Sequence, residues 1–302
     1  MNIILCKLLH NGYRKCDDVY PEGLTKEIIR LHHIHHFDAL LVNYFYLSKA
    51  LEALSIKRKA LFTHDSFSMY QKSKNHKAVF YLTKKEEQKA LMRAPFIFAM
   101  QNIEAEYFKS LSPNSVVLIN YSNCQYYIQP IAGNHNILYL AADTQINKQG
   151  LQWFINEVLP LIKKQFNDTK LLIAGGICNI LTEYDNQKDI ELIGKINDLA
   201  IFYEKGDVAI NPCQLGTGLK IKTFEAVSYD KVTLVHPNGL IGIFDANNAP
   251  IFSSSNPLEW VEYLKKVWEE NGFIARLKIK NRFYIQQMND YIMQQYKIWL
   301  EE

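Results

Sequence analysis

The feature that most limits the possible folds is an alternation, from about residue 37 onward, of short apolar runs with amphipathic stretches. In the first half, the runs that we interpret as strands are residues 37–42, 59–63, 96–100 and 116–120. The stretches between them that we interpret as helices are 47–54, 84–94 and 103–111. Strands that alternate with helices build a parallel sheet covered by helices on both faces. The pattern therefore predicts an α/β fold.

The second half of the chain repeats this alternation. It opens with an apolar run at 137–142, and the runs that follow each end in Gly or Pro, as parallel strands do beside their connecting loops. These later runs are residues 171–176, 190–194, 207–212 and 232–237. Within residues 151–166 the apolar side chains recur at helical spacing on one face. A second parallel sheet follows from this pattern.

The region between Tyr121 and Asn136 is polar and irregular and contains Pro130 and Gly133, a composition typical of domain boundaries. Because 302 residues suffice for two cores, we expect two Rossmann-like domains, residues 1–130 and 131–302. Residues 258–300 are interpreted as two helices that pack back on the first domain. That domain is expected to be shortened, because residues 1–36 contain only a weak apolar start and no Gly-rich loop.

The composition excludes several classes of protein. A net charge of +3, from 34 basic and 31 acidic residues, is too small to indicate nucleic-acid binding. The five cysteines are scattered and form no C-x-x-C pair, which favours reduced thiols in a cytoplasmic protein over disulfides or structural zinc. No apolar run approaches the length of a membrane span or of a secretory signal.

The most informative segment is NPCQLGTGLKIKTFEAV, residues 211–227, which joins a predicted strand to a predicted helix. Gly216 and Gly218 let the backbone approach a ligand, and the helix N-terminus attracts an anion. Lys220 and Lys222 add cations where a departing nucleoside diphosphate needs its charge stabilised, and Glu225 can accept hydrogen bonds from a ribose. The alternative is a solvated helix start, although cations there oppose the helix dipole by roughly 0.3–1 kcal/mol each.

This segment resembles the donor-site signature of glycosyltransferase family 4, in the subgroup with a G-x-G-L-K-x-K-x-x-E-A pattern. The resemblance covers roughly residues 134–255 and, more weakly, residues 37–120. It implies a GT-B fold and a retaining, metal-independent glycosyltransferase without a cofactor. Such an enzyme moves a sugar from a nucleotide-diphosphate sugar to a glycan or lipid-linked acceptor, here in cell-surface polysaccharide synthesis.

The resemblance also implies roles for individual residues. Glu225 is the second glutamate of the family's Glu, seven residues, Glu motif, while Thr217 occupies the position of the first, so how the hydroxyls of the donor sugar are held stays open. The loop that faces the donor phosphates matches Asn147, Lys148 and Gly150, and the base-binding loop matches Lys195 and Ile196. In the first domain, Thr63-His64-Asp65 directly follows a strand and resembles the histidine-bearing loop on the sugar side. The expected catalytic residues are His64 and Lys220, and the expected donor-binding residues are Asn147, Lys148, Gly150, Ile196, Gly216, Thr217, Gly218, Lys222 and Glu225.

Several alternatives stay open at this stage. One is a nucleotide-sugar epimerase, for which no acid and base residues stand out, and another is a non-catalytic nucleotide-sugar-binding remnant or partner subunit of a transferase. His32 and His36, one helical turn apart, suggest a metal site, but no carboxylate or cysteine nearby completes the set. Basic groups at residues 57–59 and at Lys72, Lys74 and Lys77 are compatible with a peripheral contact on the inner membrane face, or with ordinary solvated surface.

Overall fold

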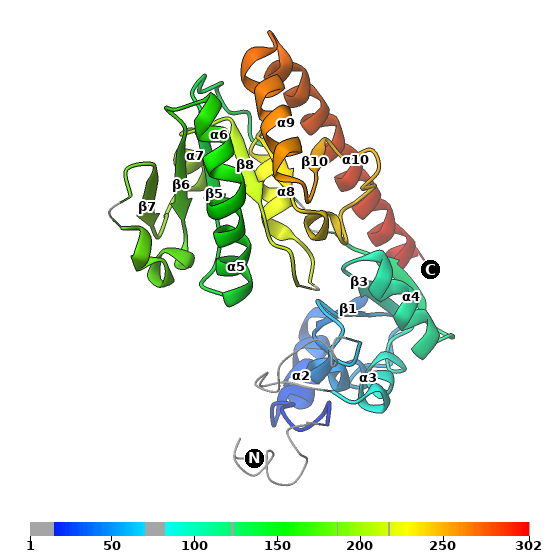
Figure 1. Ribbon diagram of the computed structural model, residues 1–302. Helices are drawn as coiled ribbons and strands as arrows, with labels where there is room; N and C mark the ends of the chain where they lie inside the picture. Colours follow the sequence, from blue (N-terminus) through cyan, green and yellow to red (C-terminus); the bar gives the residue numbers. More distant parts are fainter. Residues whose placement is uncertain (1–14, 70–81, 122–123, 186, 217, 302) are drawn as a thin grey trace. The chain divides into compact units, whose positions relative to one another are not determined.

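The computed structural model of the chain describes residues 15–69, 82–121, 124–185, 187–216 and 218–301. Thr217 of the predicted donor segment and Lys72, Lys74 and Lys77 of the basic groups lie outside these ranges. The contacts divide the chain into two compact units (Figure 1). The first unit contains residues 1–121 and 291–302, and the second contains residues 122–290.

The first unit contains a parallel sheet with the strand order β1-β2-β3-β4. Its strands are β1 (Ala39–Asn43), β2 (Arg58–Phe62), β3 (Phe96–Ala99) and β4 (Val116–Ile119). Its helical elements are α2 (Leu24–His35), a 3-10 helix (Phe45–Glu52), α3 (Lys84–Leu91), α4 (Asn102–Leu111) and the last turns of α10 (Phe273–Glu301). One face of the sheet is covered by apolar residues of α3 and α4, and the other by Tyr296 and Trp299 of α10.

The second unit contains a parallel sheet with the order β10-β9-β8-β5-β6-β7. Its strands are β5 (Asn136–Leu140), β6 (Lys170–Ala174), β7 (Ile190–Gly194), β8 (Val208–Asn211), β9 (Val232–Val235) and β10 (Ile251–Ser253). Its helices are α5 (Gln145–Trp153), α6 (Leu159–Gln165), α7 (Leu199–Tyr203), α8 (Ile221–Ser228), α9 (Pro257–Glu269) and the first part of α10. Shorter 3-10 helices span Gly176–Ile180, Thr182–Tyr184 and Pro237–Leu240.

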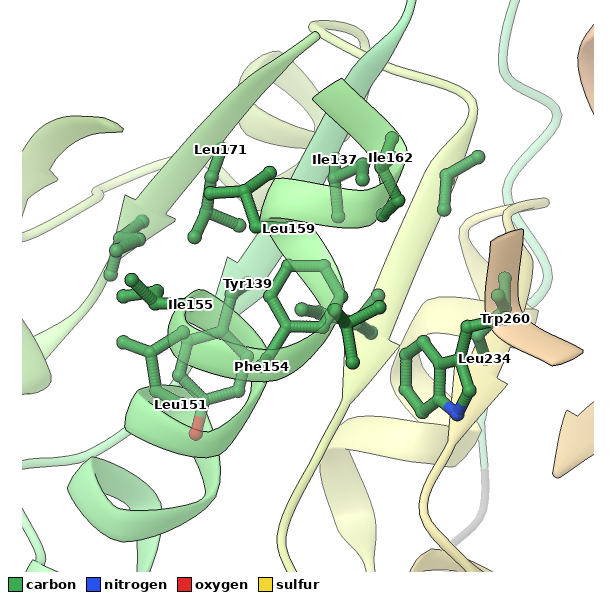
Figure 2. Close-up of a cluster of buried hydrophobic side chains, with 14 of the residues drawn as sticks. Ile137, Tyr139, Leu151, Phe154, Ile155, Leu159, Ile162, Leu171, Leu234 and Trp260 are labelled. Carbon is green, nitrogen blue, oxygen red and sulfur yellow. The ribbon is translucent and has the colours of Figure 1, made fainter. Parts of the chain in front are cut away.

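The predicted helix at 151–166 forms the centre of the second core, but it is not uniform. A π-helical turn, Phe154–Val158, separates α5 from α6. Pro160 lies at the start of α6 and cannot donate a backbone hydrogen bond to the preceding turn, which accounts for the local widening. Figure 2 shows the result: Leu151, Phe154 and Leu159 project from this continuous helical segment into a cluster shared with the β5 and β6 side chains.

The structure confirms the predicted α/β class, and each of the nine predicted runs contains a strand. The stretch predicted to be helical at 47–54 forms a 3-10 helix, Phe45–Glu52. Three of its four buried residues, Phe45, Ser48 and Leu51, are spaced three apart, which is the period at which 3-10 side chains align. Helix α2 and strand β10 were not predicted. Strand β10 has only three residues, and α2 begins at Gly23 without a side-chain cap.

Among the described residues the first sheet has four strands and the second has six. The described part of residues 1–36, residues 15–36, contains α2 and no strand. The weak apolar start at residues 3–9, on which the expectation of a shortened first domain partly rests, lies outside the described ranges.

Candidate functional site

The second sheet has its topological switch point between β5 and β8. The chain runs from β5 outward through β6 to β7 and then returns to the other side of β5. In open α/β sheets, ligands bind outside the carboxyl ends of the strands at such a point. The structure has a hollow of about 730 Å³ there, lined by the ends of β5 and β8, the start of α5, and residues 215, 216, 218–222 and 225. The second unit therefore has a candidate ligand site where its topology places one.

Lys220 holds the loop that leads into α8. Its ammonium is nearly buried and donates to the carbonyls of Gly216, at 3.0 Å, and Gly218, at 2.9 Å. Gly216 has φ +110°, a conformation that residues with a side chain rarely adopt. No side chain caps the first turn of α8, so the positive end of the helix dipole and the Lys220 charge coincide at the hollow. This arrangement suits a bound anion.

Lys222 lines the same hollow one residue into α8. Its Nζ lies 2.5 Å from Asn147 Oδ1 and 3.5 Å from Cys213 Sγ, and 5.2 Å from the centre of the Tyr139 ring. Among the described residues it makes no ion pair with a carboxylate, and burial lowers the pKa of the Lys222 ammonium below its usual 10.5. An anion in the hollow would supply the missing counter-charge.

Glu225 lies on the next turn of α8. Its Oε1 accepts a hydrogen bond from the Tyr203 hydroxyl at 2.8 Å, and burial raises the pKa of the Glu225 carboxyl. Tyr203 stacks on Tyr229, which in turn stacks on Tyr127, with ring centres 4.6 and 4.5 Å apart. This stack of rings holds Tyr203, the hydrogen-bond partner of Glu225, in place. Glu225 itself is one of the residues that line the hollow.

Asn147 and Gly150 act differently from one another. Asn147 lines the hollow, where its side-chain amide donates to the Ala142 carbonyl and its oxygen accepts from Lys222. A Cβ at Gly150 would lie 2.7 Å from Cys213 Cα and 2.8 Å from the Pro212 carbonyl oxygen. Gly150 thus allows α5 to pack closely against the end of β8. Its contribution to the site is indirect, because this packing positions α5.

Two further predicted residues, Lys148 and Ile196, do not line the hollow. Lys148 points to the Ile180 carbonyl at 2.6 Å and pairs with Glu183 at 2.7 Å. Ile196 lies in the loop after β7 and packs against the buried cluster that includes Tyr203 and Ala226. Their assignment to donor phosphate and base stays a prediction.

His64 lies in the first unit, after β2. It has φ +65°, its Nε2 lies 2.9 Å from Asn43 Oδ1, and its ring stacks on Tyr44 with centres 4.2 Å apart. Burial lowers the pKa of His64, an effect that Asp65 partly opposes. At neutral pH the imidazole is therefore uncharged and can exchange a proton with a hydroxyl group.

Two buried carboxylates anchor the loop after His64. Glu87 accepts hydrogen bonds from the backbone of Phe67 and Ser68, at 2.8 and 3.2 Å, and from the hydroxyls of Ser66 and Ser68. Glu104 accepts from the Ser66 N–H at 3.1 Å, and both carboxylates are fully buried. Burial raises the pKa of Glu104 to about 7, and Asp65 and Glu87 add to the effect.

These carboxylates were not predicted from the sequence, although a signal was present. Glu104 shares a helix face with Phe108 and Leu111, at spacings of four and seven residues, so it lies among core positions. Cys213 and Tyr203 were not predicted either, because their proximity to Lys222 and Glu225 depends on packing between distant segments.

The described residues contain neither a metal-binding cluster nor a membrane-spanning helix. No three or more His, Cys, Asp or Glu side chains there, the α2 histidines included, are grouped so as to hold a metal ion. No helix among them has both the length and the apolar character required to cross a bilayer.

Residues 134–270 match the family described as glycosyl transferases group 1. This region contains all of the hollow in the second unit. One protein of Klebsiella pneumoniae, described as an uncharacterized 44.6 kDa protein in the cps region, is 36% identical over 91 residues. Those residues are 27% of this chain and 23% of the Klebsiella protein, so the likeness spans under a quarter of that relative.

Solved structures resemble the whole chain at low sequence identity. TarM of S. aureus matches with a TM-score of 0.67 and 11% identity over 92% of this chain and 58% of TarM. Sucrose-phosphate synthase of Thermosynechococcus elongatus matches with a TM-score of 0.64 and 14% identity, covering 92% and 76% of the two chains. Anabaena HepE, solved in complex with UDP-glucose, matches with 0.59 and 13%, covering 93% and 84%. These likenesses confirm the predicted GT-B fold with its two Rossmann-like domains.

Proposed function

We propose that the chain is a glycosyltransferase that moves a sugar from a nucleotide-diphosphate sugar to a glycan or lipid-linked acceptor, with retention of configuration and without a metal ion. The role we assign to it is cell-surface polysaccharide synthesis, in keeping with the Klebsiella relative described as lying in a cps region. The cytoplasm, with a peripheral contact on the inner membrane face, is part of the same proposal. The free thiols of Cys16, Cys124, Cys178 and Cys213 are compatible with that compartment.

The observation that carries the proposal is the hollow at the switch point of the second sheet. It combines the uncapped start of α8, the buried Lys220, the partly buried Lys222 and a carboxyl, Glu225, one turn further along the same helix. A nucleoside diphosphate has the matching order of groups: two phosphates for the helix start and lysines, and a ribose for Glu225. The family match over residues 134–270 and the UDP-glucose named in the HepE structure support the same class of donor.

In this arrangement the protein promotes sugar transfer mainly by electrostatic stabilisation. Lys220, Lys222 and the α8 dipole stabilise the charge that develops on the departing diphosphate, and Lys220 also holds the carbonyls of Gly216 and Gly218. The acceptor hydroxyl attacks from the face that the diphosphate leaves, as retention requires. We assign His64, in the first unit, to the sugar side of the reaction.

The test is to measure donor binding and turnover separately. Calorimetric titration with UDP, GDP and dTDP, followed by the corresponding nucleotide sugars, identifies the donor class. Glu225→Gln should weaken nucleotide binding, because a charge-assisted hydrogen bond to the ribose exists before and during transfer. Lys220→Ala should lower kcat more than donor affinity, by roughly 2.7–4 kcal/mol if its loss resembles that of one oxyanion-stabilising group.

Lys164→Ala is the matched control, because Lys164 is an exposed lysine on α6, at the opposite end of the continuous helical segment that starts with α5. It should leave both quantities unchanged. Wild-type binding and turnover in both Lys220→Ala and Glu225→Gln would refute the assignment of this segment as the donor site. Nucleotide binding without turnover for any acceptor would instead favour the non-catalytic alternative.

A further inference from the structure

Tyr203, the last residue of α7, is nearly fully buried in the second unit, with 2% of its surface exposed. Asp198 caps this short helix by accepting a hydrogen bond from the Ala200 N–H at 2.8 Å. The preceding residue, Phe202, is equally buried and packs in the same core cluster without a hydroxyl group. Core packing at position 203 therefore requires an aromatic ring but does not account for its hydroxyl.

The hydroxyl of Tyr203 donates to Glu225 Oε1 at 2.8 Å, and Glu225 lines the hollow of the second unit. Burial and the nearby Glu225 carboxyl raise the pKa of Tyr203 well above 10, so its hydroxyl keeps the proton and acts as the donor. A hydrogen bond of this kind favours the ionised form of the carboxyl. It thus opposes the effect of burial, which raises the pKa of Glu225.

Two further rings hold Tyr203 in this orientation. Tyr229, which directly follows α8, stacks on Tyr203 with ring planes at 19°, and Tyr127 stacks on Tyr229 with planes at 11°. The Tyr127 N–H donates to the carbonyl of Ser228, the last residue of α8, at 2.7 Å. The helix that carries Glu225 therefore also anchors the stack that orients its hydrogen-bond donor.

We propose that Tyr203 is a positioning residue of the donor site, which keeps Glu225 ionised and leaves the second carboxylate oxygen for the ribose hydroxyls. An ionised carboxylate only accepts hydrogen bonds, and its two oxygens offer about four positions. Within the described ranges, the Tyr203 hydroxyl occupies one of them. The inference rests on the proposed function and makes it more specific: Tyr203 sets the lower pH limit of donor binding.

The other ionisable groups around Glu225 come from the region of α8. Tyr229 follows this helix, and burial raises its pKa to about 12, so it is uncharged at neutral pH. Lys220 and Lys222 line the hollow from the start of α8, but their ammonium groups donate to other acceptors. Tyr203 is therefore the group whose hydrogen bond tunes the ionisation of Glu225.

The first measurement uses the full chain without nucleotide. Carbon NMR of the side-chain carboxyls follows the titration of Glu225, whose signal is assigned by its loss in Glu225→Gln. Tyr203→Phe removes only the hydroxyl. It should raise the pKa of Glu225 by about one unit, because a hydrogen bond to a charged group changes an ionisation constant about tenfold.

The second measurement is the affinity for UDP, GDP and dTDP as a function of pH. At alkaline pH, where Glu225 is ionised in both proteins, Tyr203→Phe should bind within about threefold of the wild type. On the acidic side of both titrations it should bind about tenfold more weakly than the wild type, because a smaller fraction of Glu225 is ionised. The terminal phosphate of the probe also titrates, but equally for both proteins, so the ratio of affinities isolates Glu225.

Tyr263→Phe is the matched control, because Tyr263 is another partly buried tyrosine of this unit, and its ring stacks on Phe252 of the edge strand β10. It should bind like the wild type at every pH. Tyr229→Leu removes the stacked ring and should shift the acidic limb in the same direction as Tyr203→Phe. Tyr229→Phe keeps the ring and should restore the wild-type profile. These two variants serve as the test if Tyr203→Phe does not fold.

The inference and the proposed function fail in different ways. Parallel affinity profiles for Tyr203→Phe and the wild type, or an unchanged pKa of Glu225 in the variant, overturn the inference. The donor assignment then stands as long as the wild type binds one of the three diphosphates. If none of them binds to the wild type at any pH, the proposed function is wrong, and the carboxyl titration alone decides whether Tyr203 keeps Glu225 ionised.

Discussion

At the scale of single residues, Lys222 differs most clearly from an ordinary side chain of its type. Burial lowers the pKa of its ammonium below 10.5, and no carboxylate among the described residues pairs with it. Between the lowered pKa and 10.5 the folded chain holds fewer protons than the unfolded chain, so stability rises as the pH rises through this window. Where Lys222 is charged without a carboxylate partner, the free energy of unfolding is therefore lower. A bound diphosphate would act as the partner and offset this loss.

We therefore predict that binding of a nucleoside diphosphate takes up protons at alkaline pH. The anion favours the charged ammonium and raises the pKa of Lys222, so the bound state holds more protons than the free state. Calorimetric titrations in two buffers of different ionisation enthalpy measure this uptake. Lys222→Met should abolish it and weaken binding. Equal uptake in the variant and the wild type would contradict the assignment of Lys222 to the phosphates.

At the scale of single elements, α5 depends on its close contact with the end of β8. We predict that Gly150→Ala lowers the free energy of unfolding by about 1–3 kcal/mol, because the added Cβ would lie within 3 Å of backbone atoms of Pro212 and Cys213. Urea denaturation measures the loss. Nucleotide affinity should fall as well, since Asn147 and Cys213 both line the hollow. Gln149→Ala, on the exposed side of the same helix, should change neither quantity.

The loop after β2 gives a prediction about pH. The pKa of Glu104 is raised from 4.5 to about 7, so between these values the folded chain holds more protons than the unfolded chain and stability falls as pH rises. One pH unit corresponds to about 1.4 kcal/mol, so ionisation of Glu104 lowers the free energy of unfolding above pH 7 by about 3 kcal/mol. Glu104→Gln keeps the shape and the acceptor for the Ser66 N–H.

We expect Glu104→Gln to match the wild type in stability near pH 4 and to exceed it at pH 8. Thermal unfolding followed by circular dichroism across this range checks the result. Glu106→Gln is a suitable control, because Glu106 is an exposed residue of the same helix. A variant whose stability runs parallel to the wild type at every pH would show that Glu104 is not the titrating group.

At the scale of the whole molecule, α10 contains residues of both units. Its last turns, from Tyr291 onward, belong to the first unit, where Trp299 packs edge-to-face on Phe98 with ring centres 5.8 Å apart. Trp299 is 6% exposed and completes the cluster on one face of the first sheet. The first unit thus takes part of its core from the end of the chain.

We predict that Trp299→Ala destabilises the first unit by about 3–5 kcal/mol, the usual cost of truncating a buried large aromatic side chain. Hydrogen exchange of β2 and β3 amides measures the loss locally. Nucleoside-diphosphate affinity should stay unchanged, because the lining of the hollow belongs to the second unit. The adjacent Leu300 is 44% exposed, and Leu300→Ala should have little effect on either measurement.

The sequence alone determined the α/β class, nine strands and the segment that carries the candidate donor site. These features depend on local signals: the period of apolar residues, the Gly and Pro at strand ends, and the pattern from Gly216 to Glu225. Elements with weak local signals could not be predicted from the sequence. The three-residue β10 and the uncapped α2 were missed, and the helix after β1 was predicted without indicating that it is a 3-10 helix.

Only the tertiary structure decided what the predicted residues contact. Lys220 binds its own loop, Lys222 meets Asn147 and Cys213, and Lys148 pairs with Glu183 outside the hollow. The stacking of Tyr44 on His64 likewise joins two strand ends that lie about twenty residues apart in the sequence. Such contacts are formed between segments distant in sequence, and their geometry follows from sheet order and close packing, which no local pattern contains.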